Sequence, residues 1–599
     1  MEVIMCVQEN REHITSKILN ILKTISVIYG LLSIWILQNC DNFETGMAYI
    51  FSKSSNNLVI VLVFSFLMYL FENNNLNLKS YKWYEYFTAG ILGIIFIISV
   101  GFQKFDTILF VRSCGIQVLF AVICWTFIIL FLYEILFCRV VLQGKIEYQV
   151  SVQKIMIFLL VCWLPYIIIF YPGATSWDGM YQLNQYQGVQ ELTNKNPVIV
   201  TYLMGIFVQI GSAIGNQNLG LFFYTFAQTL FLAYVLGLGL ALVSTQKCKA
   251  DVFYITCFGA AIFPIPLFST YVLLKDGFYC AFCTLFCILI LKICIEKKKF
   301  WHSKINIFLF VLSELGVMIF RKNGIYVVIL TTLALLICEM QWKKILFISL
   351  LCILCYKTSD YVVEDVMNIP AGGDAEIYSL PLQQVTRYYI NYGIDISEEE
   401  KQVLLEVLNI DTCAEVYNEF LSDPVKGQFS NEASSKQILA FLKLWLGLFF
   451  KHPLVYVDAF LGNANSYLEP TGIMISERGF FYINHVLPND AYDFTFGIEA
   501  AEQLRQDYRQ FLGYGENIPF LGVLFHPGLY TWWLLGITCV FLKKKKVYIK
   551  CLVPLYVTLL VCFVSPVNGA VRYALPLIET IPIISIMCKT ENVDIRVTH

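Results

Sequence analysis

The chain has 599 residues, of which 58% are hydrophobic and 14% charged, and its formal net charge at pH 7 is -2. Ordinary globular domains contain about 25% charged residues, so this composition indicates a polytopic membrane protein. A net charge this close to zero gives no support to nucleic-acid binding.

Apolar stretches near the length that spans a bilayer, about 20 residues, recur along the chain. The N-terminus carries Glu2, Glu9 and Glu12 and has no small-residue cleavage site, which favours a retained signal anchor. Fifteen candidate spans result, at 17–38, 57–71, 86–101, 112–137, 155–171, 198–213, 219–243, 252–271, 277–295, 305–320, 324–340, 344–358, 527–542, 549–565 and 571–588.

If all fifteen cross, the basic clusters EKKKFWHSK (296–304) and KKKK (543–546) fall outside the cell, against the positive-inside rule. The stretch 198–213 is short and contains Thr201, Gln209 and Ser212, so we expect it to lie along the outer surface. The remaining fourteen spans then place the basic clusters inside. We therefore predict an all-α polytopic protein of the plasma membrane with about fourteen transmembrane helices and both termini in the cytoplasm.

This topology divides the chain into four parts. Residues 1–150 form an N-terminal four-helix membrane extension, and 151–358 form a membrane core with a long outer loop at 172–218. Residues 359–526 form a mostly helical extracytoplasmic soluble domain, inserted before the three last transmembrane helices and cytoplasmic tail of 527–599.

Four short segments place charged residues at the predicted outer face: TSWDGMY, LLKDGFY, FRKNGIY and VNGAVRYALP. Basic residues in short outer turns run against the charge bias that orients the protein, and charges beside hydrocarbon mark function by default. The candidate site residues are Asp178, Lys275, Asp276, Arg321, Lys322 and Arg572.

Each candidate also has a purely structural interpretation. Asp178 is a suitable N-cap for MYQLNQYQG, and Asp276 for the helix that starts at Gly277. Lys275 is able to snorkel to the headgroups. The segment 321–324 is a plausible interhelical turn, and Arg572 a plausible interfacial anchor.

The set of charges suits an enzyme that uses a lipid-phosphate-linked sugar. Cations hold the phosphate and stabilise the departing charge, while a carboxylate takes the proton from the acceptor hydroxyl. Nucleotide sugars stay in the cytoplasm, so an outward-facing transferase needs its sugar delivered on a lipid. The alternatives are a non-enzymatic translocase or binding protein for lipid-linked glycans, and a structural or sensory membrane protein. A flippase should contain inverted repeats, and the sequence has no internal repeat.

Motifs for other chemistry are absent from the sequence. It has no GxxxxGK[ST] and no GxGxxG after a strand. Its six histidines are scattered, so we expect no bound zinc. Asp374 and Glu376 in AGGDAEIY are a weak candidate for a divalent ion, with a solvated loop as the alternative.

The order of several motifs resembles the GT-C superfamily, the multi-span, lipid-linked-sugar-dependent glycosyltransferases that include protein mannosyltransferases and lipid A aminoarabinose transferases. The motifs are an outer-loop acid, a Pro-containing helix start (NKNPVIVTYLMG), a second outer-loop acid and a late RYxLP element. The segments PGATSWDGMYQ, LLKDGFY, FRKNGIYVV, PLQQVTRYY, KHPLVYVDAFLGN and VRYALPL are similar to an uncharacterised family of bacterial membrane proteins in that class.

The resemblance implies a catalytic acid at Asp178, a second acid at Asp276 and a phosphate-side basic residue at Arg572, with an envelope acceptor as partner. Lys275, Arg321 and Lys322 are the further candidates for the donor phosphate. The family's usual first-loop His-Pro is Asn196-Pro197 here, and Asp178 follows the fifth span rather than the first.

Overall fold

The computed structural model describes residues 25–37, 81–139, 144–146, 149–263, 270–339, 341–471, 492, 494–495, 497–517 and 522–590. It contains two compact units. The smaller unit comprises 1–141, 448–461 and 471–473, and the larger unit comprises the rest. The predicted extension 1–150 thus corresponds largely to the smaller unit, which also takes in a short part of the predicted outer domain.

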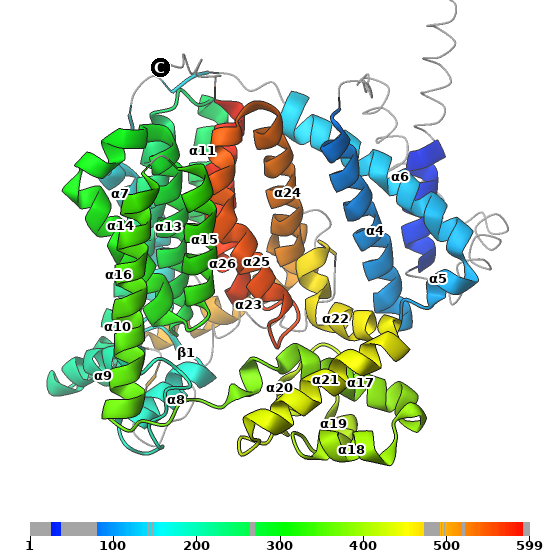
Figure 1. The fold of residues 1–599 in the computed structure, drawn as a ribbon. Helices are drawn as coiled ribbons and strands as arrows, with labels where there is room; N and C mark the ends of the chain where they lie inside the picture. Colours follow the sequence, from blue (N-terminus) through cyan, green and yellow to red (C-terminus); the bar gives the residue numbers. More distant parts are fainter. Residues whose placement is uncertain are drawn as a thin grey trace, which may run out of the picture. The chain divides into compact units, whose positions relative to one another are not determined.

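Helices dominate both units (Figure 1). The smaller unit contains the helix Ile25–Leu37, α4 (Trp83–Phe105), α5 (Phe110–Ser113), α6 (Gly115–Tyr133) and the π-helix Glu134–Arg139. Within it, the Asp458 carboxylate accepts hydrogen bonds from Thr107 Oγ1 at 2.8 Å and from the Ile108 amide at 2.7 Å.

The larger unit begins with α7 (Val152–Ile169), α8 (Trp177–Tyr186), α9 (Val198–Ala213), α10 (Gln217–Ser244), α11 (Ala250–Ile262), α13 (Asp276–Glu296), α14 (Lys304–Phe320), α15 (Gly324–Cys338) and α16 (Trp342–Tyr361). It continues with α17 (Ser379–Tyr392), α18 (Glu398–Leu405), α19 (Ile410–Val416) and α20 (Asp423–Lys426). Two helices, α21 (Ser435–Lys451) and α22 (Pro453–Leu468), have residues in both units. The larger unit ends with α23 (Glu502–Asn517), α24 (Pro527–Lys544), α25 (Val553–Phe563) and α26 (Val571–Ile586).

Eight helices among the described residues are long and apolar enough to cross a membrane, or nine if α21 and α22 form one bent span. Several predicted spans are shorter helices in the structure, such as α11 with 13 residues. The predicted span 57–71 and the C-terminal residues 591–599 lie outside the described residues.

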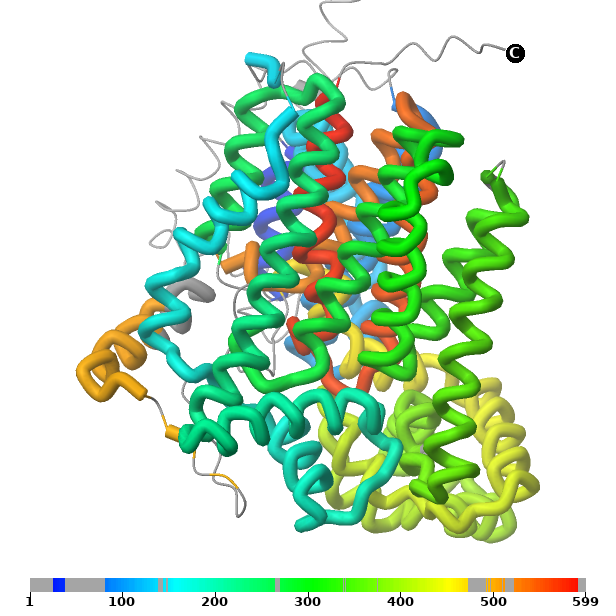
Figure 2. Tube along the Cα trace, turned by 90° about the vertical axis from the view of Figure 1, so that its left-hand side faces the viewer, coloured from blue at the N-terminus to red at the C-terminus, as the bar shows by residue number. Residues whose placement is uncertain are grey.

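Helix α9 runs across the long helices rather than along them (Figures 1 and 2). Its buried residues, including Met204 and Val208, belong to the face that packs on α10. Its opposite face exposes Ile199, Ile206 and Ile210. With 16 residues, α9 is one of the shorter apolar helices of the structure.

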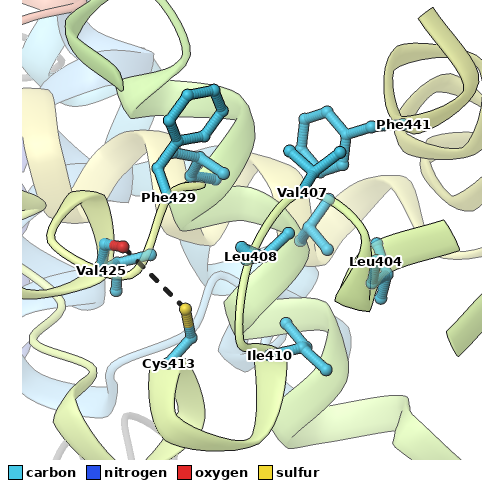
Figure 3. Close-up of a cluster of buried hydrophobic side chains, with 10 residues drawn as sticks. Leu404, Val407, Leu408, Ile410, Cys413, Val425, Phe429 and Phe441 are labelled. Carbon is cyan, nitrogen blue, oxygen red and sulfur yellow. Dashed lines mark hydrogen bonds between the residues drawn. The ribbon is translucent and has the colours of Figure 1, made fainter. Parts of the chain in front are cut away.

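Helices α17 to α21 enclose a separate hydrophobic core, shown in Figure 3. Side chains in this core include Leu382, Val385, Leu404 and Phe441, each with no exposed surface. The helix α18 starts with a capping box, in which Ser397 and Glu400 satisfy each other's amides. These features give the predicted soluble insertion a helical structure with a core of its own.

Candidate functional site

A two-stranded parallel sheet joins the first two charged segments. Strand β1 (Ala174–Thr175) pairs with β2 (Val272–Leu273), with Ala174 opposite Val272. Gln228 of α10 supports β2 because its Nε2 donates to the carbonyls of Thr270 at 3.1 Å and Val272 at 3.0 Å. Each strand is followed within three residues by a helix with an aspartate in its first turn, Asp178 in α8 and Asp276 in α13, so the sheet brings the starts of these helices together.

Helix α8 is capped by Ser176, not by Asp178. The Ser176 hydroxyl accepts from the Gly179 amide at 3.0 Å and donates to the Leu273 carbonyl at 2.9 Å. A Cβ at Gly179 would lie 2.1 Å from the same carbonyl oxygen, so only glycine permits this approach. The N-cap interpretation of Asp178 is therefore wrong, and the Asp178 carboxylate is not used to cap α8.

Asp178 forms an ion pair with Arg572, nearly 400 residues later in the chain. Arg572 Nη1 donates to Asp178 Oδ2 at 3.1 Å, and the two side chains are 26% and 40% exposed, respectively. Arg572 lies in the first turn of α26, and the turn before it is held by Tyr467, whose hydroxyl donates to the carbonyls of Val567 at 3.0 Å and Ala570 at 3.2 Å. Both side chains of this pair are thus partly accessible to solvent.

A second ion pair, between Arg321 and Asp276, is more buried. Arg321 Nη1 donates to Asp276 Oδ1 at 3.4 Å, with side chains 15% and 3% exposed. Asp276 is the first residue of α13, and Lys275 precedes it as the N-cap, whose side chain makes no capping hydrogen bond. The predicted capping role of Asp276 at Gly277 is thus not observed.

Both arginines lie over the ring of Tyr573. The distance from the ring centroid to Cζ is 4.3 Å for Arg321 and 4.9 Å for Arg572. Arg572 Nη2 also donates to the Tyr573 hydroxyl at 3.0 Å. The face of an aromatic ring attracts cations, which favours this grouping of two like charges.

Lys275 joins the same cluster, whereas Lys322 does not. Lys275 Nζ donates to Asn196 Oδ1, and the charges of Asp178, Asp276 and both arginines act on it. Lys322 instead pairs with Glu364 at 3.4 Å. Five of the six predicted residues therefore form one group, which we call the outer-turn cluster: Asp178, Lys275, Asp276, Arg321 and Arg572.

The electrostatics of the outer-turn cluster favour an anion. Burial tends to raise the pKa of Asp178, but Arg572 and Lys275 outweigh it and bring the pKa below its usual value. Burial lowers the pKa of Lys275, and the charges of Asp178 and Asp276 oppose that shift. Three cations and two carboxylates leave a net charge of one positive, and only one of the carboxylates is accessible.

Three residues at or beside this cluster were not among the predicted site residues. Two of them belong to motifs of the sequence, Tyr573 to the RYxLP element and Asn196 to the NKNP segment. Glu364 belongs to none of these motifs. Its Oε1 accepts from Asn194 Nδ2 at 2.6 Å as well as from Lys322.

The residues that the structure describes contain no group of three His, Cys, Asp or Glu side chains placed to hold a metal ion. Glu376, one of the two weak candidates, pairs with Lys426 at 2.7 Å. The ion pair gives Glu376 a structural partner in α20.

Comparison with protein-family models gives a match over residues 187–597 to a family described as "Family of unknown function (DUF6020)". Searches of curated proteins and of solved structures find no match. The matched stretch contains Lys275, Asp276, Arg321 and Arg572 and begins nine residues after Asp178. Since it covers more than half of the chain, the protein belongs to the DUF6020 family.

Proposed function

We propose that the protein is an integral membrane glycosyltransferase of the GT-C type. It transfers a sugar from a polyprenyl-phosphate donor to an acceptor hydroxyl on the outer face of the plasma membrane. The observation that carries the proposal is the outer-turn cluster, in which an accessible carboxylate lies beside two guanidinium groups and a lysine. This is the combination that such a transfer requires, a base next to an anion site.

The proposed reaction is a single displacement with inversion. Asp178 takes the proton of the acceptor hydroxyl, whose oxygen forms a bond to the anomeric carbon of the sugar. The bond between that carbon and the phosphate oxygen breaks, and the oxygen keeps the electron pair. Arg572, Arg321 and Lys275 stabilise the charge on the departing polyprenyl phosphate. The leaving group needs no proton, so one base is sufficient.

The two carboxylates have different roles in this proposal. Asp178 is 40% exposed and reachable by an acceptor, while Asp276 is 3% exposed and bonded to Arg321. We therefore assign the base to Asp178 and treat Asp276, which the resemblance presents as a second catalytic acid, as the residue that positions Arg321. Lys322 has no part in the phosphate site because it pairs with Glu364.

The proposal includes the membrane topology predicted from charge. Fourteen spans place both termini in the cytoplasm and the outer-turn cluster outside. The crosswise orientation of α9 supports this arrangement, in which 198–213 lies along the outer surface (Figure 2). The acceptor is a hydroxyl-bearing component of the cell envelope.

Reconstituted protein tests the proposal. Proteoliposomes receive a panel of polyprenyl-phosphate hexoses with labelled sugar, together with an envelope extract as the acceptor source. Loss of label from the lipid and release of polyprenyl phosphate are measured. We expect protein-dependent release with at least one donor. Movement of intact labelled lipid between leaflets, without release, would contradict the enzyme and identify a translocase.

A further inference from the structure

The proposed reaction, on which this inference rests, requires the ion pair between Asp178 and Arg572 to open. In the structure, Arg572 Nη1 donates to Asp178 Oδ2. The proposed base and the arginine proposed to bind the phosphate are therefore bonded to each other. A donor phosphate competes with the Asp178 carboxylate for the same guanidinium. When it succeeds, Asp178 is released and becomes available to the acceptor hydroxyl.

Opening an exposed ion pair normally frees both side chains, because each loses its only fixed partner. Arg572 differs because it has a second attachment. Its Nη2 donates to the Tyr573 hydroxyl at 3.0 Å, and its Cζ lies 4.9 Å from the centre of the Tyr573 ring. Tyr573 is 7% exposed. The guanidinium therefore keeps a rigid support after Asp178 leaves.

The same ring also supports Arg321, whose Cζ is 4.3 Å from its centre. Asp276 fixes the other side of that guanidinium through the bond to Nη1. Two guanidinium groups over one ring repel each other, and a bound anion relieves that repulsion. The Tyr573 ring thus holds both guanidinium groups in one cluster.

We infer that Tyr573 is the positioning residue that keeps Arg572 and Arg321 directed at the donor phosphate after Asp178 has left Arg572. Its hydroxyl orients Arg572, and its ring holds the two guanidinium groups in one cluster. Tyr573 does not touch the reacting atoms, so its removal acts through the arginines.

Two substitutions separate the hydroxyl from the ring. Tyr573→Phe removes only the hydroxyl, and Tyr573→Leu removes the ring as well. The matched control is Tyr530→Phe in α24, which loses a comparable buried hydroxyl bond, to the Leu524 carbonyl at 3.0 Å. Binding of a short-chain polyprenyl monophosphate to purified protein is measured by calorimetry, and thermal unfolding shows whether each variant is folded.

We expect Tyr573→Phe to weaken lipid-phosphate binding roughly tenfold, because the loss of a hydrogen bond to a charged group typically has an effect of this size. Tyr573→Leu should weaken it further, and Tyr530→Phe should bind like wild type. Asp178→Asn should bind as tightly as wild type or more tightly, because a competitor for Arg572 is gone. In sugar transfer, Tyr573→Phe should raise the donor KM and also lower kcat, because the two arginines hold the phosphate and stabilise its departing charge.

Wild-type affinity in folded Tyr573→Phe and Tyr573→Leu would overturn the inference, and so would wild-type values of both kcat and donor KM in these variants. The outcome is separable from that of the proposed function. If wild type binds lipid phosphate but transfers no sugar, and the Tyr573 variants still lose binding, the positioning role stands and the transferase fails.

Discussion

At the scale of single residues, two aspartates with similar sequence contexts form ion pairs in different environments. Both acids occur as Asp-Gly in short segments after apolar runs. Asp178 pairs with Arg572 where both side chains are partly exposed, whereas Asp276 pairs with Arg321 in a largely buried position. The first pair is suited to exchange with substrate, and the second to fixing a cation.

This difference predicts that Asp276→Asn destabilises the protein. Removing one partner of a buried pair leaves the other charge uncompensated, at a typical cost of about 3–5 kcal/mol. The matched control is Lys322→Gln, whose partner Glu364 lies in a more exposed pair, and such pairs contribute about 0–1 kcal/mol. Thermal unfolding in detergent measures both. Equal, small shifts in Tm would contradict the buried role of Asp276.

The pKa of Lys275 predicts a pH dependence of donor binding. Burial brings this pKa below 10.5, so Lys275 loses its proton, and its attraction for phosphate, at a lower pH than an ordinary lysine. Lipid-phosphate affinity should therefore fall as the pH rises above neutrality toward 10. A phosphate monoester is fully ionised by about pH 8, since its second pKa is about 6, and it does not cause this fall.

Lys275→Arg is the control, because arginine stays charged across this range. It should bind lipid phosphate with little change up to pH 10. The affinity is measured in steps from pH 7 to pH 10. An identical alkaline fall in wild type and Lys275→Arg would show that another group is responsible.

At the scale of elements, the β1–β2 contact decides where Asp178 lies. Gly179→Ala should disrupt this contact, because the new Cβ meets the Leu273 carbonyl oxygen at 2.1 Å. Gly259→Ala in α11 is the matched helical control, since no atom lies within 4 Å of its Cβ. We expect Gly179→Ala to lower Tm and abolish sugar transfer, and Gly259→Ala to change neither. Full activity in Gly179→Ala would mean that the strand pair does not position the site.

Much of the helical framework was predictable, because apolar length is a local property. The predicted span 219–243 corresponds to α10, Gln217–Ser244, within two residues. The positions of the basic clusters 296–304 and 543–546 led to the prediction that 198–213, which forms α9, does not span the membrane. Local patterns did not reveal the strand pair, since two-residue strands joined by tertiary contacts have no periodicity to detect.

The site shows a similar division. The unusual charges at predicted outer turns indicated which residues form the outer-turn cluster, but not which acid pairs with which base. Both Ser176 and Asp178 are good N-cap residues, and the contact of Ser176 with the Leu273 carbonyl decides between them. Lys322 and Glu364 are 42 residues apart, so no local pattern indicated that this lysine pairs outside the cluster.

At the scale of the whole molecule, the account predicts one orientation of the larger unit in the membrane. Ile394 in the outer helical domain is fully exposed, and Lys298 is exposed between α13 and α14. A membrane-impermeant thiol reagent should label Ile394→Cys in intact cells and Lys298→Cys only after permeabilisation. The parent protein, which has an exposed Cys355, provides the background. The reverse pattern would place the outer-turn cluster in the cytoplasm and exclude a lipid-linked donor on the outer face.

The central claim is that Asp178 is the base of a sugar transfer. The most direct test compares wild type with Asp178→Asn for the release of polyprenyl phosphate from a labelled donor in proteoliposomes. Asparagine keeps the shape of the side chain and does not disturb the α8 cap, which Ser176 provides. The account predicts a loss of about 10²–10⁴ in turnover, with lipid-phosphate binding at least as tight as in wild type. Undiminished transfer by Asp178→Asn, at a wild-type rate, would contradict it.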